Sequence, residues 1–121
     1  MEPIEIFLQV GAALTVINVW TLRLNKSTPW RGGNATNMRE EFEEYGLPRW
    51  TLVTVGSAKL LFALLLVVGI GIQEVTPFAA AGMSTLLLGA LVAHIKIRDP
   101  LKKSMPAASM LAALVVVLVL Q

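Results

Sequence analysis

Four long apolar blocks constrain the fold of this chain more than any other feature of its 121 residues. They cover about residues 4–24, 48–72, 77–97 and 105–120. A helix needs about 20 residues to cross the hydrocarbon core of a bilayer, and the first three blocks reach that length. The fourth spans only about 22 Å, so it requires a start nearer Leu101, a thinner bilayer or support from neighbouring helices.

No block alternates apolar and polar residues, and this excludes strands as the membrane-spanning elements. Prolines stand near the starts of three blocks, where the first turn of a helix accepts them: Pro48, Pro77 and Pro106. The sequence therefore predicts an all-α fold, a transmembrane four-helix bundle, with residues 1–121 as one integral membrane domain.

Basic residues predict the orientation of this bundle. Nine of the ten Lys and Arg residues lie in or beside the two hydrophilic connections, and these nine are Arg23, Lys26, Arg31, Arg39, Arg49, Lys96, Arg98, Lys102 and Lys103. The two termini and the turn at Gln73–Val75 carry none. Such a bias places both connections in the cytoplasm and both termini outside. The same bias explains the basic net charge of the chain without a role in binding nucleic acid. We expect the membrane to be a bacterial inner membrane.

The composition excludes several kinds of chemistry. The chain has no cysteine, so disulfides, thiolate metal sites, iron–sulfur clusters and a catalytic thiol are excluded. With a single histidine, a histidine-rich metal or haem site is not expected. We therefore predict no catalytic residue, no metal site and no cofactor held by the chain alone.

The first connection contains a short helix over about residues 37–45. Thr36 or Asn37 can cap it, and an apolar stripe of Met38, Phe42 and Tyr45 predicts a helix on the cytoplasmic face. Among the four glutamates of this helix, Glu41 lies closest to the stripe. Four acids on one short helix point in different directions, which favours a solvated face over a calcium site. The preceding Arg31-Gly32-Gly33 is most simply a flexible turn.

Lys59 interrupts the second apolar block. It follows Trp50 by nine residues, which places it about 14 Å deep, where a lysine costs roughly 2.5–3.5 kcal/mol. One interpretation is that the side chain only snorkels toward the cytoplasmic end of its helix. The other is a pocket inside the bundle that holds an anion, a carbonyl ligand or a buried carboxylate. Gly56, on the same face, favours close helix contact.

Matching depths suggest which residues face Lys59. The polar candidates are Asn18 and Thr15 of the first block and Thr85 and Ser84 of the third. Glu41 is the best charged candidate if the short helix folds over the pocket. His94 lies nearer the cytoplasmic end, where it either forms interfacial hydrogen bonds or continues a polar track. The hypothetical ligand site therefore comprises Lys59, Asn18, Glu41, His94 and Thr85.

Three stretches, STPWRGGNATNMREEFEEYGLPRW, VGSAKLLFALLL and GALVAHIKIRDPLKKSMPA, resemble the DoxX-like family of small membrane proteins. The resemblance implies a four-helix bundle in a membrane. The family takes its name from a subunit associated with a quinone-linked thiosulfate oxidoreductase, and its wider relatives include assembly or trafficking factors. The resemblance supplies no agreed set of catalytic residues.

Two functions follow as expectations. The first is a non-catalytic accessory, assembly or scaffold protein that binds a small lipid or quinone-like ligand near Lys59. The second is the membrane subunit of a quinone-linked oxidoreductase whose redox centres lie on a partner. Transport is a third reading, and it would require an oligomer to enclose a path. The expected partners are the lipid bilayer and further copies of the chain or other subunits of a membrane complex.

Overall fold

The computed structural model describes every residue from Met1 to Gln121, and all of its regular structure is helical. Four long helices form the bundle: α1 (Pro3–Trp20), α3 (Arg49–Val68), α4 (Thr76–Lys96) and α5 (Leu101–Leu120). The short helix α2 (Met38–Glu44) lies in the first connection, and the 3-10 turn η1 (Gln73–Val75) joins α3 to α4. The predicted all-α four-helix bundle is confirmed.

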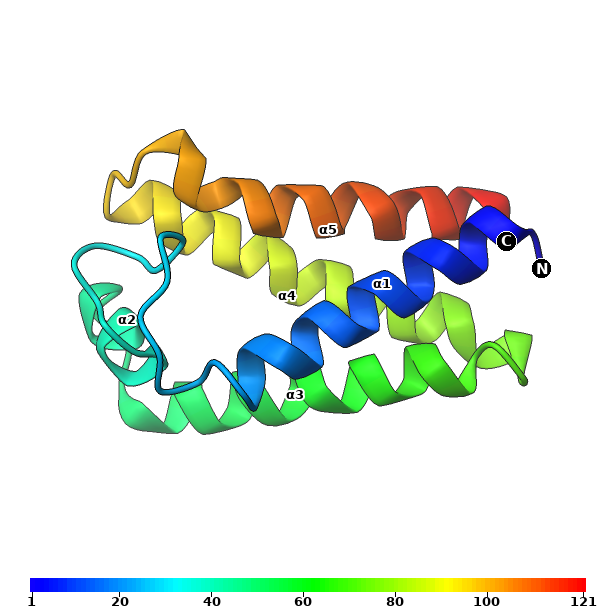
Figure 1. The fold of residues 1–121 in the computed structure, drawn as a ribbon, viewed down its shortest axis with the longest axis horizontal. Helices are drawn as coiled ribbons and strands as arrows, with labels where there is room; N and C mark the ends of the chain where they lie inside the picture. The colour runs from blue at the N-terminus through cyan, green and yellow to red at the C-terminus, as the bar shows by residue number, and fades with distance from the viewer.

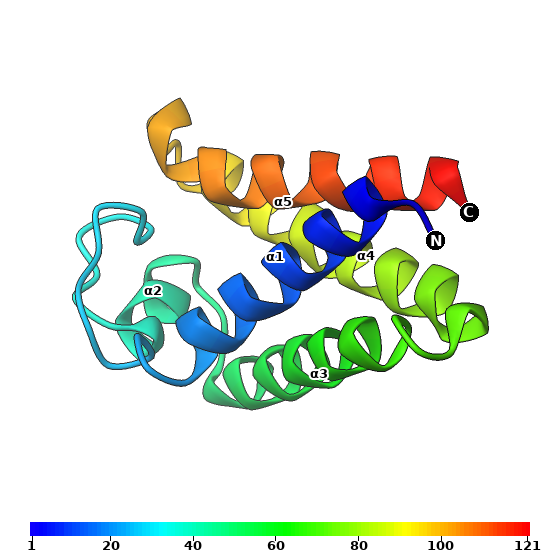
Figure 2. The same ribbon diagram turned by 45° about the vertical axis from the view of Figure 1, so that its right-hand side comes forward.

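The two termini lie together at one end of the bundle, and α2 lies at the other (Figure 1). We call these the terminal end and the α2 end. Helix α1 packs against α3 and α5, and α4 packs against the same two helices, so the four long helices close a ring. The turned view in Figure 2 shows α2 beside the end of α1 and the start of α3.

Local chemistry sets the helix boundaries. Helix α5 begins at Leu101, directly after Pro100, and its 20 residues reach about 30 Å, enough to cross a bilayer. Helix α1 ends at Trp20, before the predicted end near Leu24, because the chain then folds around Arg31. The guanidinium of Arg31 donates to the carbonyls of Arg23, Leu24 and Lys26, which therefore do not need a further helical turn.

Helix α3 ends at Val68, before the predicted end at Ile72, because side chains satisfy its last carbonyls. The amide of Gln9 donates to the Leu66 carbonyl at 2.6 Å and to the Thr76 hydroxyl at 3.0 Å. The Thr76 hydroxyl in turn donates to the Gly69 carbonyl at 3.2 Å. Carbonyls at a helix end require such partners when they are buried.

The core of the bundle is apolar and rich in small side chains. Its buried members come from all four long helices: Ala12, Ala13, Val16, Ala63, Leu66, Ala79, Ala80, Met83, Leu87, Leu114 and Val117. The outward faces are just as apolar, with Phe7 at 74 % and Val119 at 77 % exposure. A chain that is apolar both inside and outside is suited to lipid rather than water. All four long helices are long and apolar enough to span a membrane.

Helix α2 closes the α2 end through its predicted stripe. Met38, Phe42 and Tyr45 are all buried, as the stripe predicted. The Phe42 ring meets the Trp20 ring of α1 edge-on, with centroids 5.9 Å apart. Asn37 is the cap, since its side chain accepts a hydrogen bond from the Glu40 backbone N–H at 2.9 Å. The structure thus selects Asn37 rather than Thr36.

Candidate functional site

A buried ion pair anchors α2 to the loop that precedes it. Arg31 Nη1 lies 3.1 Å from Glu41 Oε2, and the two side chains are only 4 % and 10 % exposed. The other carboxylate oxygen, Oε1, accepts the Gly32 backbone N–H at 2.8 Å. A buried ion pair is stable only when its remaining donors and acceptors find partners. The carbonyls around Arg31 and the N–H of Gly32 meet this condition.

Tyr45 extends this pair toward α4. Its hydroxyl donates to Glu41 Oε1 at 2.9 Å and lies 3.4 Å from His94 Nε2. Burial raises the pKa of the Tyr45 phenol well above its ordinary value, and the nearby charge of Glu41 raises it further. The phenol therefore keeps its proton throughout the physiological pH range and remains a hydrogen-bond donor.

His94 pairs with Asp99 on its other side. The distance from His94 Nδ1 to Asp99 Oδ2 is 2.6 Å, and Asp99 Oδ1 accepts the Gly33 backbone N–H at 3.0 Å. Arg98 has a left-handed backbone, with φ of 56°, and this turn after α4 carries Asp99 back to His94. Arg31, Glu41, Tyr45, His94 and Asp99 thus form one continuous series of contacts. We call it the buried polar chain.

The glycines of the loop are required by this geometry. A Cβ atom on Gly32 would lie 2.6 Å from Cε1 of Tyr45, and Gly33 has a φ of 56°. Only glycine adopts both positions without strain. The predicted turn at Arg31-Gly32-Gly33 is held by hydrogen bonds: Arg31 and Gly32 donate to Glu41, and Gly33 donates to Asp99.

Lys59 lies outside the buried polar chain, on α3. Its Nζ lies 5.4 Å from the centroid of the Trp20 ring, in the geometry of a cation–π contact. Gly56 lets the ring approach, since a Cβ there would lie 2.8 Å from Trp20 Cε3. No salt bridge or hydrogen bond of the structure involves the ammonium. The Phe42 ring contacts Trp20 edge-on and the Tyr45 ring in a tilted geometry, so it connects the Trp20 side of the α2 end with the buried polar chain.

The structure brings some of the predicted site residues together and separates others. Glu41 and His94 belong to the buried polar chain, where Glu41 pairs with Arg31 and not with Lys59. Asn18 is partly buried in α1, and its side chain makes no hydrogen bond. Thr85 is exposed, and its hydroxyl donates to the Ala81 carbonyl of its own helix at 2.9 Å. Thr85 therefore makes no hydrogen bond with the rest of the set.

Sequence reasoning missed two members of the buried polar chain and gave Tyr45 only a packing role. Arg31 was grouped with its two glycines as a turn, and Asp99 was masked by the basic residues around it. A signal for Asp99 did exist. It is the only carboxylate in the second connection, and it follows His94 closely enough to fold back onto it.

These features define a class of protein: an integral membrane bundle of four helices whose α2 end is closed by a short helix and a buried polar chain. The sequence model of the DoxX-like family matches residues 31–118, and the chain therefore belongs to the DoxX-like family. The matched region begins at Arg31 and includes the whole buried polar chain and Lys59. Neither the curated proteins nor the solved structures contain a significant match to this chain.

Proposed function

We propose that this protein is a non-catalytic accessory, assembly or scaffold protein of the membrane that binds a small lipid or quinone-like molecule near Lys59. One observation carries the proposal. The ammonium lies about halfway along a membrane-spanning helix. Its cation–π contact with the Trp20 ring is the only electrostatic contact that it makes within the protein. A desolvated cation–π contact contributes about 2 kcal/mol, less than the roughly 2.5–3.5 kcal/mol that a central lysine costs.

The chemistry of the site suggests what completes it. The ammonium has N–H donors without acceptors, and a carbonyl or anionic oxygen of a ligand would supply them. The Trp20 ring beside it offers a flat apolar surface to a ring or a chain. Lys59 is only partly buried, so a ligand dissolved in the bilayer has access to it. These features together suit an amphipathic molecule with an oxygen-bearing head.

The buried polar chain supports a structural role at the α2 end. Arg31 pairs with Glu41, and His94 Nδ1 contacts Asp99, so these side chains connect α2 with the turn after α4. These contacts hold the closing helix in place. A well-fixed closed end suits a scaffold or a binding protein. Further copies of the chain or other membrane subunits are the partners proposed for it.

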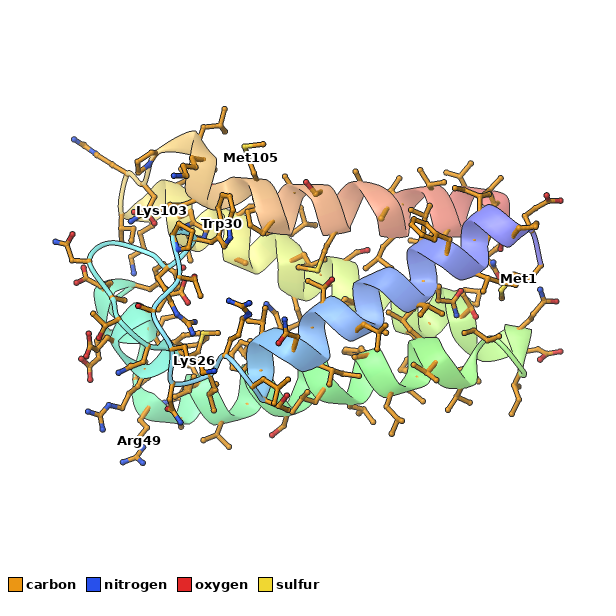
Figure 3. All side chains as sticks on the ribbon, in the orientation of Figure 1. Met1, Lys26, Trp30, Arg49, Lys103 and Met105 are labelled. Atoms are coloured by element: carbon orange, nitrogen blue, oxygen red, sulfur yellow. The ribbon has the colours of Figure 1, made fainter.

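Charge supports one orientation of this scaffold. Figure 3 labels Lys26, Arg49 and Lys103 at the α2 end, while Met1 lies at the opposite end. Basic residues concentrate on the cytoplasmic side of membrane proteins. We therefore propose that the α2 end faces the cytoplasm and that both termini lie outside, in a bacterial inner membrane.

A second function is the membrane subunit of a quinone-linked oxidoreductase whose redox centres lie on a partner. The observation that favours it is the series of contacts that links Asp99 and His94 through Tyr45 to Glu41, since chains of carboxylates and histidines form the proton relays of membrane proteins. Co-purification separates the two functions. A partner that carries a cofactor supports the second, and a stable colourless homo-oligomer supports the first.

The test is to purify wild type, Lys59→Met and Lys26→Met in a mild detergent and to analyse bound small molecules by mass spectrometry. Lys26 is exposed, so its variant is a matched control for the loss of one ammonium group. We expect a lipid or quinone-like molecule to remain with wild type and Lys26→Met and to be lost from Lys59→Met. The same molecules in equal amounts in all three would overturn the Lys59 site.

A further inference from the structure

A separate hollow of about 260 Å³ opens at the α2 end, and Lys59 does not line it. It lies between the segment after α1, the start of α2 and the start of α3. Two arginines line it, Arg39 and Arg49. Its volume falls just below the range of about 300–1,000 Å³ that is typical of sites for drug-sized ligands. The hollow therefore suits a small charged group rather than a whole ligand of that size.

The charges around the hollow are free to bind an anion. Arg49 forms no salt bridge, and the one ion pair of Arg39, with Glu43, has a separation of 3.9 Å and exposures of 63 % and 65 %. Such an exposed pair contributes little and is easily exchanged for a better partner. Asn25 also lines the hollow, and its side-chain amide makes no hydrogen bond within the protein.

The floor of the hollow has the opposite character. Three apolar residues, Leu24, Met38 and Leu52, share the lining of the hollow with the two arginines. Trp50, next to Arg49, is 68 % exposed, and exposed tryptophans of this kind mark the level of the lipid headgroups. A ligand that fits both parts has an anionic group attached to hydrocarbon.

We propose that this hollow binds a phosphate group, supplied by the headgroup of an anionic phospholipid. Arginine forks match the paired oxygens of a phosphate, and Asn25 can donate a further hydrogen bond. The apolar floor would contact the first carbons beyond the phosphate. Free phosphate shares the anionic chemistry but leaves this floor unused, and the lipid is therefore the favoured source.

The test measures binding of phosphatidylglycerol to the full chain in detergent micelles. The variants are Arg39→Gln, Arg49→Gln and Arg23→Gln, the last being a control arginine that is exposed but does not line the hollow. Hydrogen bonds to charged groups are strong enough that losing one guanidinium should weaken binding at least about tenfold. Arg23→Gln should bind like wild type, and so should Lys59→Met, since the Lys59 site is a different one.

Two further probes identify the source of the phosphate. Diacylglycerol, which lacks the phosphate, should not bind, and inorganic phosphate should compete only weakly. Equal weakening by Arg23→Gln, or equal binding of diacylglycerol, would overturn the site. Competition by inorganic phosphate in the concentration range of the lipid would keep the phosphate site and make the free anion its occupant.

Discussion

The buried ion pair of Arg31 and Glu41 should be a major determinant of stability at the α2 end. Removing one partner leaves the other charge buried, which typically costs about 3–5 kcal/mol. In this structure Arg31 keeps its carbonyl acceptors and Glu41 keeps the donors of Gly32 and Tyr45. We therefore expect about 3 kcal/mol, the lower end of that range, for Arg31→Met and for Glu41→Gln.

A double-mutant cycle isolates the interaction itself. If the two charges pair as the structure shows, Arg31→Met combined with Glu41→Gln should cost about 2 kcal/mol less than the sum of the single changes. The matched control is Arg39 with Glu43, the same residue types on α2 at 3.9 Å, both largely exposed. Its coupling energy should be about 0.3–0.5 kcal/mol, as for exposed helix pairs.

The assay is reversible unfolding in mixed detergent micelles, followed by the circular dichroism of the helices. Each variant is first checked for wild-type elution, so that only folded protein enters the comparison. A coupling energy for Arg31 and Glu41 no larger than that of the exposed pair would refute the reasoning. It would mean that the carboxylate of Glu41 is solvated rather than enclosed with the guanidinium.

Three further predictions concern other parts of the molecule. Gly32→Ala should destabilise the protein by about 1–3 kcal/mol, because its Cβ would overlap the Tyr45 ring, while Gly89→Ala meets no atom within 4 Å and should change the unfolding free energy by less than about 1 kcal/mol. Tyr45 is the only tyrosine, so ultraviolet titration reports its ionisation alone. The pKa of Tyr45 in the folded protein lies above the unfolded value of about 10, so the free energy of unfolding should fall as the pH rises above 10. Tyr45→Phe should remove this phenol-dependent fall. The chain has no cysteine, so thiol labelling of Asn34→Cys from the cytoplasm and of Glu74→Cys from outside should report the proposed orientation, and the reverse pattern would contradict it.

The architecture could be predicted from the sequence because apolar length and helix punctuation are local properties. The stripe of Met38, Phe42 and Tyr45 also followed from helical spacing alone. The partners of Glu41 could not be predicted in the same way. Its position on the stripe was clear, but its contacts with Arg31 and Gly32 depend on how the loop after α1 folds back. The helical periodicity of the sequence carries no information about how a loop folds back onto a helix.

Helix ends were likewise beyond local patterns. The apolar block from Ile4 continues to Leu24, yet α1 ends at Trp20, because Arg31 satisfies the carbonyls that follow. The same limit applies to His94. Its position in the third apolar block, now α4, was predicted, whereas its pairing with Asp99 requires the left-handed turn at Arg98. Helical patterns predicted the position of each residue along its helix, and the tertiary fold determined which partners its side chain contacts.

The contact between Gly33 and Asp99 has a consequence for how the nascent chain is completed. The two residues are 66 positions apart, so at about 5–20 residues per second the ribosome needs roughly 3 to 13 seconds to reach the second after the first. During that interval the pair of Arg31 and Glu41 can form by itself, but α2 has no His94 or Asp99 to dock against. Phe42 can already pack on Trp20 of α1, but Tyr45 has no His94 ring to contact. Synthesis of α4 and the α4–α5 turn supplies these last contacts.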